Sequence, residues 1–233
     1  MKIAVCQINP TPADLEGNLA KILAAVEEAV VLKPVVIVFP EMALPGCHPK
    51  DILLDSSFIT ACASCLEFLT EELDGFPPVI LGTVLQNASG LENAAVLVEG
   101  GADRQITAKQ ALPNYDVYNE GRWFSRGKKR EVVEIAGKKV LILVGGEMET
   151  VEDIPDCDIV ISLAASPFIP DQADKRIVYG TGFNIPFVYA NLVGGNDQLI
   201  FEGGSFTLNA HGELIHQMDR FTEQTQLIDL EAA

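Results

Sequence analysis

The feature that most constrains the fold of this chain is a series of short, strongly apolar runs rich in β-branched residues. Runs such as KIAVCQI, VVIVFP, KVLILVGG and DIVISLAAS are bounded by glycine, proline or polar residues, as is typical of β-strands. Several are apolar along their whole length, which predicts strands that are covered on both faces. Further runs of this kind are PVILGTVL, NAAVLVE, FVYANLV and LIFEGGSFTL.

Two segments between these runs have the periodicity of amphipathic helices. They cover residues 18–32 and about 57–73, and in each the apolar residues fall on one face. Helices interleaved with strands, and a hairpin-like pair around Ala88-Ser89-Gly90, predict an α/β layered domain with a mixed sheet. A length of 233 residues with 48% hydrophobic content fits one large domain over residues 1–233.

The charge balance argues against two classes of partner. The formal net charge is −17, and the longest basic cluster is the short GKKR at residues 127–130. Such a chain repels phosphate backbones and anionic lipid, so we expect neither a nucleic acid nor a membrane partner. Gln7 and Asn9 interrupt the first apolar run too early for a signal peptide or a membrane span. We therefore expect a cytoplasmic protein.

The cysteines and histidines follow no disulfide or metal pattern. The five cysteines are odd in number and scattered, and Cys62 with Cys65 lacks a second pair or nearby histidines. A buried structural role is the expectation for this pair. We expect no metal and no cofactor, since the histidines are also dispersed, at His48, His211 and His216.

Three polar features follow strand-like runs, where α/β proteins collect their chemistry. Glu41 follows VVIVFP, Lys109 follows QITA, and Gly145-Gly146-Glu147 follows VLILV. Taken singly, a glutamate after a strand is usually a helix cap or a loop residue, and a lysine usually lies on the surface. The sequence around these residues changes that interpretation.

Four segments that contain these residues resemble the nitrilase superfamily of carbon–nitrogen hydrolases, and most of all the glutaminase domain of glutamine-dependent NAD synthetases. They are MKIAVCQINPTPADLEGNLAKI, FPEMALPGCHPKDILL, KQALPNYDVYNEGRWFSRG, and a fourth that spans ISLAASPF and YANLVGGNDQLIFEGGSFTLNAHGEL. Together they cover nearly the whole chain in the family's order. The resemblance implies a four-layer α-β-β-α sandwich and a homo-oligomer formed through an outer face.

The resemblance also implies the roles of individual residues. In the family a cysteine thiolate attacks an amide carbonyl, a glutamate acts as general base and then acid, and a lysine stabilises the oxyanion. These last two roles fall on Glu41 and Lys109, with Glu120 as the supporting glutamate. A nearby base helps to form a thiolate from a thiol of pKa about 8.5, and a fixed ammonium stabilises the developing negative charge. Substrate contacts are implied for Tyr115, Glu147, Ser166 and Lys175, and both Lys175 and Arg176 fall near a basic position that contributes to glutamine binding in the family.

The chain departs from the family at the nucleophile. There the strand leads to a sharp elbow where the cysteine is followed by glutamate and aspartate. On the resemblance the cysteine position falls on Gly146, followed by Glu147 and Met148. Glycine cannot form a thioester, although it suits a strained turn because it accepts φ > 0. Cys47, six residues after Glu41, is the candidate for a substitute thiol, but catalysis tolerates little displacement of a nucleophile.

Three functions follow from these observations. The first is a protein that has lost covalent amidase activity and binds a small amide or amino-acid-like ligand, or acts as a scaffold or regulatory subunit. The second is a working amide or glutamine hydrolase in which Glu41 and Lys109 activate water or serve an unexpected thiol. The third is supply of ammonia to a separate synthetase subunit, because the family's NAD synthetases continue into an ATP-dependent domain and this sequence stops at LIDLEAA. Loss of the nucleophile favours the first.

Overall fold

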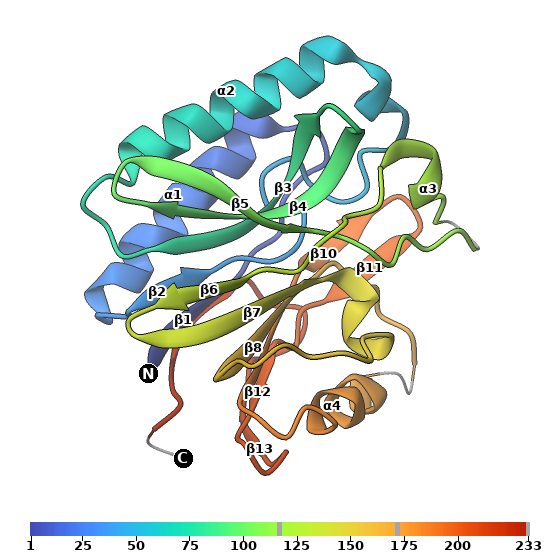
Figure 1. Ribbon diagram of the computed structural model, residues 1–233. Coiled ribbons are helices and arrows are strands. Elements are labelled where there is room, and N and C mark those ends of the chain that lie inside the picture. The colour runs from blue at the N-terminus through green and yellow to red at the C-terminus, as the bar shows by residue number, and fades with distance from the viewer. Residues whose placement is uncertain (116–117, 171–172, 232–233) are drawn as a thin grey trace.

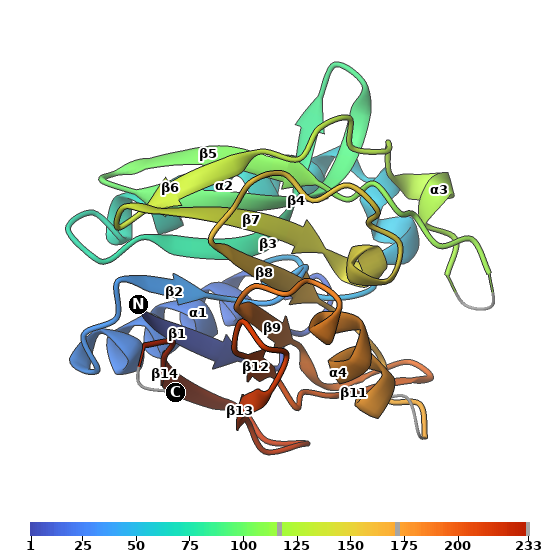
Figure 2. The same ribbon diagram turned by 60° about the horizontal axis from the view of Figure 1, so that its bottom comes forward.

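The computed structural model describes residues 1–231 apart from 116–117 and 171–172. Two six-stranded sheets pack face to face, and helices cover their outer faces (Figures 1 and 2). Helices α1 (Leu15–Val31) and α2 (Ser56–Glu72) lie over one sheet, and α4 (Ala173–Thr181) lies over the other (Figure 1). This arrangement is the α-β-β-α sandwich that the sequence predicts.

The first sheet has the strand order β14-β1-β2-β3-β4-β5. Strands β1, β2 and β3 are parallel to one another, and the remaining pairs are antiparallel. The elements of this half are β1 (Lys2–Gln7), α1 (Leu15–Val31), β2 (Val36–Val38), the 3-10 helix η1 (Lys50–Leu54), α2 (Ser56–Glu72), β3 (Val79–Asn87), β4 (Gly90–Glu99), β5 (Ala102–Ala108) and β14 (Gln224–Asp229).

The second sheet has the order β13-β12-β9-β8-β7-β6, with β7, β8 and β9 parallel. Its elements are the short helix α3 (Glu120–Trp123), β6 (Val132–Ile135), β7 (Lys138–Val144), the 3-10 helix η2 (Gly145–Glu149), β8 (Ile159–Ala164), α4 (Ala173–Thr181), β9 (Phe187–Asn191), β12 (Phe206–Leu208) and β13 (Leu214–Gln217). A separate hairpin consists of β10 (Val193–Asn196) and β11 (Leu199–Glu202).

The continuous apolar strands are explained by this layering. Alternate residues of β7 point to opposite faces, so Val140 and Ile142 pack between the sheets whereas Leu141 and Leu143 pack under η2 and α4. The side chains of β1 alternate in the same way, between the core that lies between the sheets and the face that α1 covers. Burying each such side chain contributes about 1.5–3 kcal/mol, so both faces of these strands stabilise the fold.

The two predicted helices are present, and their starts depend on capping. Helix α2 begins one residue before the predicted start at Ser57, and Asp55 caps it by accepting from the Ser57 backbone N–H at 2.8 Å. Helix α1 begins at Leu15, earlier than predicted, because Asp14 accepts from the Gly17 N–H at 3.0 Å. In the part of the chain that the structure describes, no helix has the length and apolarity to span a membrane.

Candidate functional site

Three charged residues predicted to act together meet where the sheets end. Glu41 lies just after β2, Lys109 follows β5, and Glu120 begins α3. The Lys109 Nζ lies 2.8 Å from Glu41 Oε1 and 2.8 Å from Glu120 Oε1. Each of the three is only 3–4% exposed. We call Glu41, Lys109 and Glu120 the acidic cluster, because it holds two carboxylates and one ammonium.

Glu41 is fixed by two further donors. Asn93 of β4 donates through Nδ2 to Oε1 at 2.7 Å, and the backbone N–H of Ala165, just after β8, donates to Oε2 at 2.9 Å. The loop of Glu41 can approach β3 because Gly82 lies beneath it, where a Cβ would meet the Glu41 Cα at 2.5 Å. The sequence analysis missed Asn93, although a polar residue at the start of the apolar run NAAVLV is a usable signal.

Burial and charge set the protonation of this cluster. Burial alone would lower the pKa of Lys109, but Glu41 and Glu120 outweigh it and hold that pKa above its ordinary value. Burial raises the pKa of Glu120 to about 7, against the attraction of Lys109 and with a further rise from Glu41. Glu120 is therefore a carboxyl group that exchanges its proton near neutral pH.

The structure moves the nucleophile position from Gly146 to Gly145. Gly145 has φ +65°, and a Cβ there would lie 2.6 Å from Lys109 Nζ and 3.2 Å from Glu41 Oε2. A Cβ on Gly146 would meet no described atom within 4 Å, and Gly146 is exposed. The correction has a simple physical reason: only the first glycine of the elbow faces the acidic cluster. No thiol stands at either position.

Glu147, which was expected to contact substrate, lies behind the elbow instead of in the cavity. With Gly145 at the cysteine position, Glu147 aligns with the family's aspartate, and it is fully buried. Its Oε2 accepts from the Val144 N–H at 3.2 Å, and its Oε1 accepts from the backbone N–H of Gln110. The carboxylate thus ties the elbow to the loop of Lys109, and Glu147 does not line the cavity in front of the cluster.

That cavity has a volume of about 480 Å³ and is lined by the whole acidic cluster and both elbow glycines. Tyr115 and Ser166, two of the predicted substrate contacts, line it as well. Lys175 does not: it is exposed on α4, whereas the adjacent Arg176 lines the cavity. Apolar wall residues are Leu112, Pro113, Phe168, Ile169, Leu199 and Ile200.

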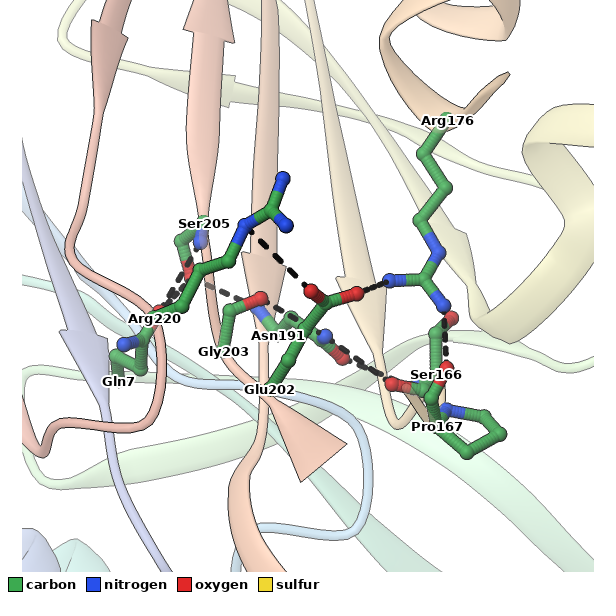
Figure 3. Close-up of polar contacts among 9 residues, drawn as sticks. All are labelled: Gln7, Ser166, Pro167, Arg176, Asn191, Glu202, Gly203, Ser205 and Arg220. Atoms are coloured by element: carbon green, nitrogen blue, oxygen red, sulfur yellow. Dashed lines mark hydrogen bonds and ion pairs between the residues drawn. The ribbon is translucent and has the colours of Figure 1, made fainter. Parts of the chain in front are cut away.

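Arg176 belongs to a second group of buried charges (Figure 3). Its Nη1 donates to Glu202 Oε1 at 2.7 Å and its Nη2 donates to the carbonyl of Pro167 at 2.5 Å. Arg220 Nε lies 3.5 Å from the other oxygen of Glu202, whose side chain is 1% exposed. We call Arg176, Glu202 and Arg220 the basic cluster. Glu202 and Arg220 were not predicted from the sequence.

The turn that carries Ser166 is held by its backbone. Asn191 accepts from the Ser166 N–H at 2.9 Å and donates to the Ser166 carbonyl at 3.2 Å and to the Gly203 carbonyl at 3.0 Å (Figure 3). Ser205 donates from Oγ to Gln7 at 2.9 Å and accepts from the Asn191 N–H. These contacts fix the backbone of Ser166, a residue that lines the cavity.

The substitute thiol and its neighbour also line the cavity. Cys47 is 3% exposed, and burial, with the added repulsion of Glu41 and Glu120, raises its pKa well above the ordinary thiol value. Lys109 offsets this only in part. A thiol in this state is a poor nucleophile. Burial lowers the pKa of His48 to about 4, so that imidazole is neutral at physiological pH.

Known proteins similar to this chain match most of its length. The carbon–nitrogen hydrolase family matches residues 2–154. Glutamine-dependent NAD(+) synthetases from Synechocystis and Thermotoga maritima are 32% and 30% identical over 97% and 99% of this chain, which covers 45% and 42% of their lengths. The chain thus spans less than half of these relatives.

Solved structures give the same result. Glutamine-dependent NAD+ synthetase from Acinetobacter baumannii matches 99% of this chain and 46% of its own, with 25% identity and a TM-score of 0.88. An amidase of the nitrilase superfamily from Nesterenkonia covers 99% of this chain and 90% of its own, with 20% identity and a TM-score of 0.81, a likeness of fold. Because the family match covers well over half of the residues, the chain belongs to the carbon–nitrogen hydrolase family.

Proposed function

We propose that this domain binds a small amide or amino-acid-like ligand without cleaving it through a covalent intermediate. The observation that carries the proposal is Gly145, which faces Lys109 and Glu41 where family chemistry requires a thiol. A base and an oxyanion-stabilising ammonium accelerate acyl transfer by assisting a nucleophile, and their contributions do not add up to a reaction without one.

Packing at the elbow supports the same proposal. The Lys109 ammonium occupies the space that a side chain at Gly145 would need. The acidic cluster is also valuable to the fold, because removing one partner of a buried ion pair costs about 3–5 kcal/mol. Its retention is therefore compatible with a site that no longer performs covalent catalysis.

The cavity suits a ligand with polar groups at both ends. The acidic cluster and Arg176 of the basic cluster both line the cavity, together with apolar side chains. An amino-acid-like ligand places its carboxylate at Arg176 and its side-chain end at the acidic cluster. Tyr115 and Ser166 are the further contacts that we propose.

The proposal extends to a regulatory or scaffold role in an assembly. The relatives that this chain matches are NAD synthetases of which it spans less than half. We propose either association with copies of itself or pairing with a separate synthetase subunit in the cytoplasm. No nucleic acid or membrane is part of the proposal, because the net charge is −17.

A working hydrolase is the alternative. It would use Glu41 and Lys109 to activate water, and would deliver ammonia to a synthetase. The intact cluster favours it, but Glu41 already accepts from Asn93, Lys109 and the Ala165 N–H. A water in front of Glu41 must compete with these three donors.

The experiment is ammonia release from glutamine, asparagine and simple amides. We expect no release above the buffer rate by the wild type, Glu41→Gln or Gly146→Cys, and slow glutamine hydrolysis by Gly145→Cys. The Gly146→Cys variant is the matched control, because it adds the same thiol one residue away. Wild-type turnover that Glu41→Gln abolishes would overturn the proposal.

A further inference from the structure

The acidic cluster has more negative than positive charge. Glu41 and Glu120 share the single ammonium of Lys109, and none of the three is more than 4% exposed. When Glu120 is ionised, the cluster has an excess of one negative charge in a region with little water. A buried charge without a partner is costly, so the cluster is stabilised by a proton or by a second cation.

Glu120 also has a buried carboxyl oxygen without a hydrogen-bond partner among the described residues. Its Oε1 accepts from Lys109 at 2.8 Å, so the oxygen without a partner is Oε2. Glu120 contributes to the cavity wall, and a ligand donor can satisfy this buried oxygen once the carboxyl group turns toward the cavity. The carboxyl oxygens of Glu41 already have protein donors. The unsatisfied group and the excess charge thus belong to the same side chain.

From these two observations we infer that the acidic cluster binds a primary ammonium group, and that the ligand is a small amino acid whose side chain ends in an amine. This inference rests on the proposed function, since it names the ligand of the same cavity. An amide offers donors but no charge, whereas an ammonium supplies both the missing donor and the missing cation. Loss of the thiol at Gly145 leaves the recognition of charge as the use of the cluster.

The groups around Glu120 keep their charge near neutral pH. The pKa of Lys109 is raised, so it stays cationic, and burial raises the pKa values of Cys47 and Tyr118, so both stay neutral. His48, with a pKa of about 4, is also neutral. Charged residues on α3 itself and on η1, which packs against α3, are Arg122, Lys50 and Asp51, and Lys50 pairs with Asp197 at 2.6 Å.

Burial and Glu41 raise the pKa of Glu120 to about 7, so its ionised fraction increases between pH 6 and pH 8. Glu149 also lines the cavity, and burial raises its pKa against the attraction of Arg176. A side-chain amine with an ordinary pKa of about 10.4 is cationic at both pH 6 and pH 8. Affinity for an amine therefore rises with pH, and binding at pH 7 releases a proton from Glu120.

Ornithine and glutamine are the matched probes, because both carry a nitrogen after the same number of chain atoms. Isothermal titration at pH 8 should show ornithine binding roughly tenfold to hundredfold more tightly than glutamine, the range expected for one charge-assisted contact. The difference should shrink at pH 6. Titration of ornithine at pH 7 in buffers of different ionisation enthalpy should reveal a released proton. Norvaline, without the terminal nitrogen, measures the contribution of the remaining chain.

Glu120→Gln tests the assigned residue, with Glu120→Asp as the charge-preserving control. We expect the glutamine variant to lose both the preference for ornithine and the proton release, while its glutamine affinity changes by only a few fold. If Glu120→Gln does not fold, the change in the wild-type preference for ornithine between pH 6 and pH 8 tests the inference instead. Glutamine binding more tightly than ornithine at pH 8 overturns the inference and leaves the proposed function standing. Failure of every probe to bind overturns the proposed function as well.

Discussion

The acidic cluster lines the cavity, the basic cluster reaches it through Arg176, and the two clusters have opposite compositions. The acidic cluster places two carboxylates around the ammonium of Lys109, and the basic cluster places two guanidinium groups around the carboxylate of Glu202. They also differ in their access to water. Every member of the acidic cluster is almost fully buried, whereas the side chain of Arg220 is 40% exposed.

This difference predicts which of the two clusters selects the ligand. The excess positive charge of the basic cluster reaches solvent through Arg220, so it is stabilised without a ligand. The excess negative charge of the acidic cluster has no such route, and burial raises the pKa of Glu120 instead. Ligand identity should therefore be set at the acidic end, while the basic end provides anchoring.

The largest effect is expected for Lys109→Met, which leaves Glu41 and Glu120 facing each other without a cation. Breaking a buried ion cluster in this way should lower the free energy of unfolding by about 3–5 kcal/mol. Urea denaturation measures it. Lys175→Met, on the exposed surface of α4, is the control and should change stability by less than about 0.5 kcal/mol. A loss below about 1 kcal/mol for Lys109→Met would show that the cluster is not effectively buried.

In the basic cluster we expect Glu202→Gln to destabilise by about 2–3 kcal/mol, less than Lys109→Met. Arg176 would lose its charged partner but would keep the Pro167 carbonyl and a neutral acceptor. Arg220→Gln should cost about 1 kcal/mol or less, because its side chain is partly in water. The same denaturation series gives both values. Equal losses for Glu202→Gln and Arg220→Gln would contradict the difference in solvent access.

At the elbow we expect Gly145→Ala to destabilise by about 1–3 kcal/mol, because φ +65° disfavours a side chain and the new Cβ would press on Lys109. Gly146→Ala should have an effect below about 1 kcal/mol, since its Cβ would have open space. Thermal unfolding of the two variants compares adjacent glycines of one sequence. A larger loss of stability for Gly146→Ala than for Gly145→Ala would indicate that Gly146, and not Gly145, faces the acidic cluster.

The smallest effect concerns pH. From about pH 4.5 to pH 7 the unfolded chain releases the Glu120 proton and the folded chain keeps it, so stability falls as pH rises. His48 acts in the opposite sense between about pH 4 and pH 6.5, because only the unfolded chain protonates it. The two contributions to the free energy of unfolding offset each other in the wild type, each amounting to roughly 3 kcal/mol over its pH window.

Two substitutions separate these contributions. Glu120→Gln should make stability rise with pH over this window, and His48→Gln should make it fall. Chemical denaturation of both variants at half-unit pH steps checks the signs. Unchanged profiles in both would mean that neither group has a shifted pKa in the folded state.

The sequence predicts the layers well and the fine geometry of the site less well. Apolar β-branched runs require strands covered on both faces and so predict a layered α/β domain, whereas the four-layer sandwich was implied by the family resemblance. The elbow could not be placed to one residue, because Gly145 and Gly146 are identical in sequence and differ in φ and in where a Cβ would point. Lys175 and Arg176 pose the same problem, since successive helical residues point about 100° apart.

Buried polar partners were harder to find, because they are fixed by tertiary contacts. Glu202 ends an apolar strand, and Asn191 ends another, so each could be read as a loop residue. Only the packed structure shows that Glu202 accepts a hydrogen bond from Arg176 of α4 and that Asn191 accepts one from the backbone N–H of Ser166. A polar residue that terminates an apolar run is a signal worth using in such chains.

Glutamine labelled with ¹⁵N at its side-chain amide, followed by NMR in the presence of the wild-type protein, distinguishes a binding site from a hydrolase directly. We expect glutamine to bind and to be recovered intact after prolonged incubation, with no labelled ammonium above the protein-free control. Catalytic conversion to glutamate and labelled ammonium, lost in Glu41→Gln, would contradict the proposed function.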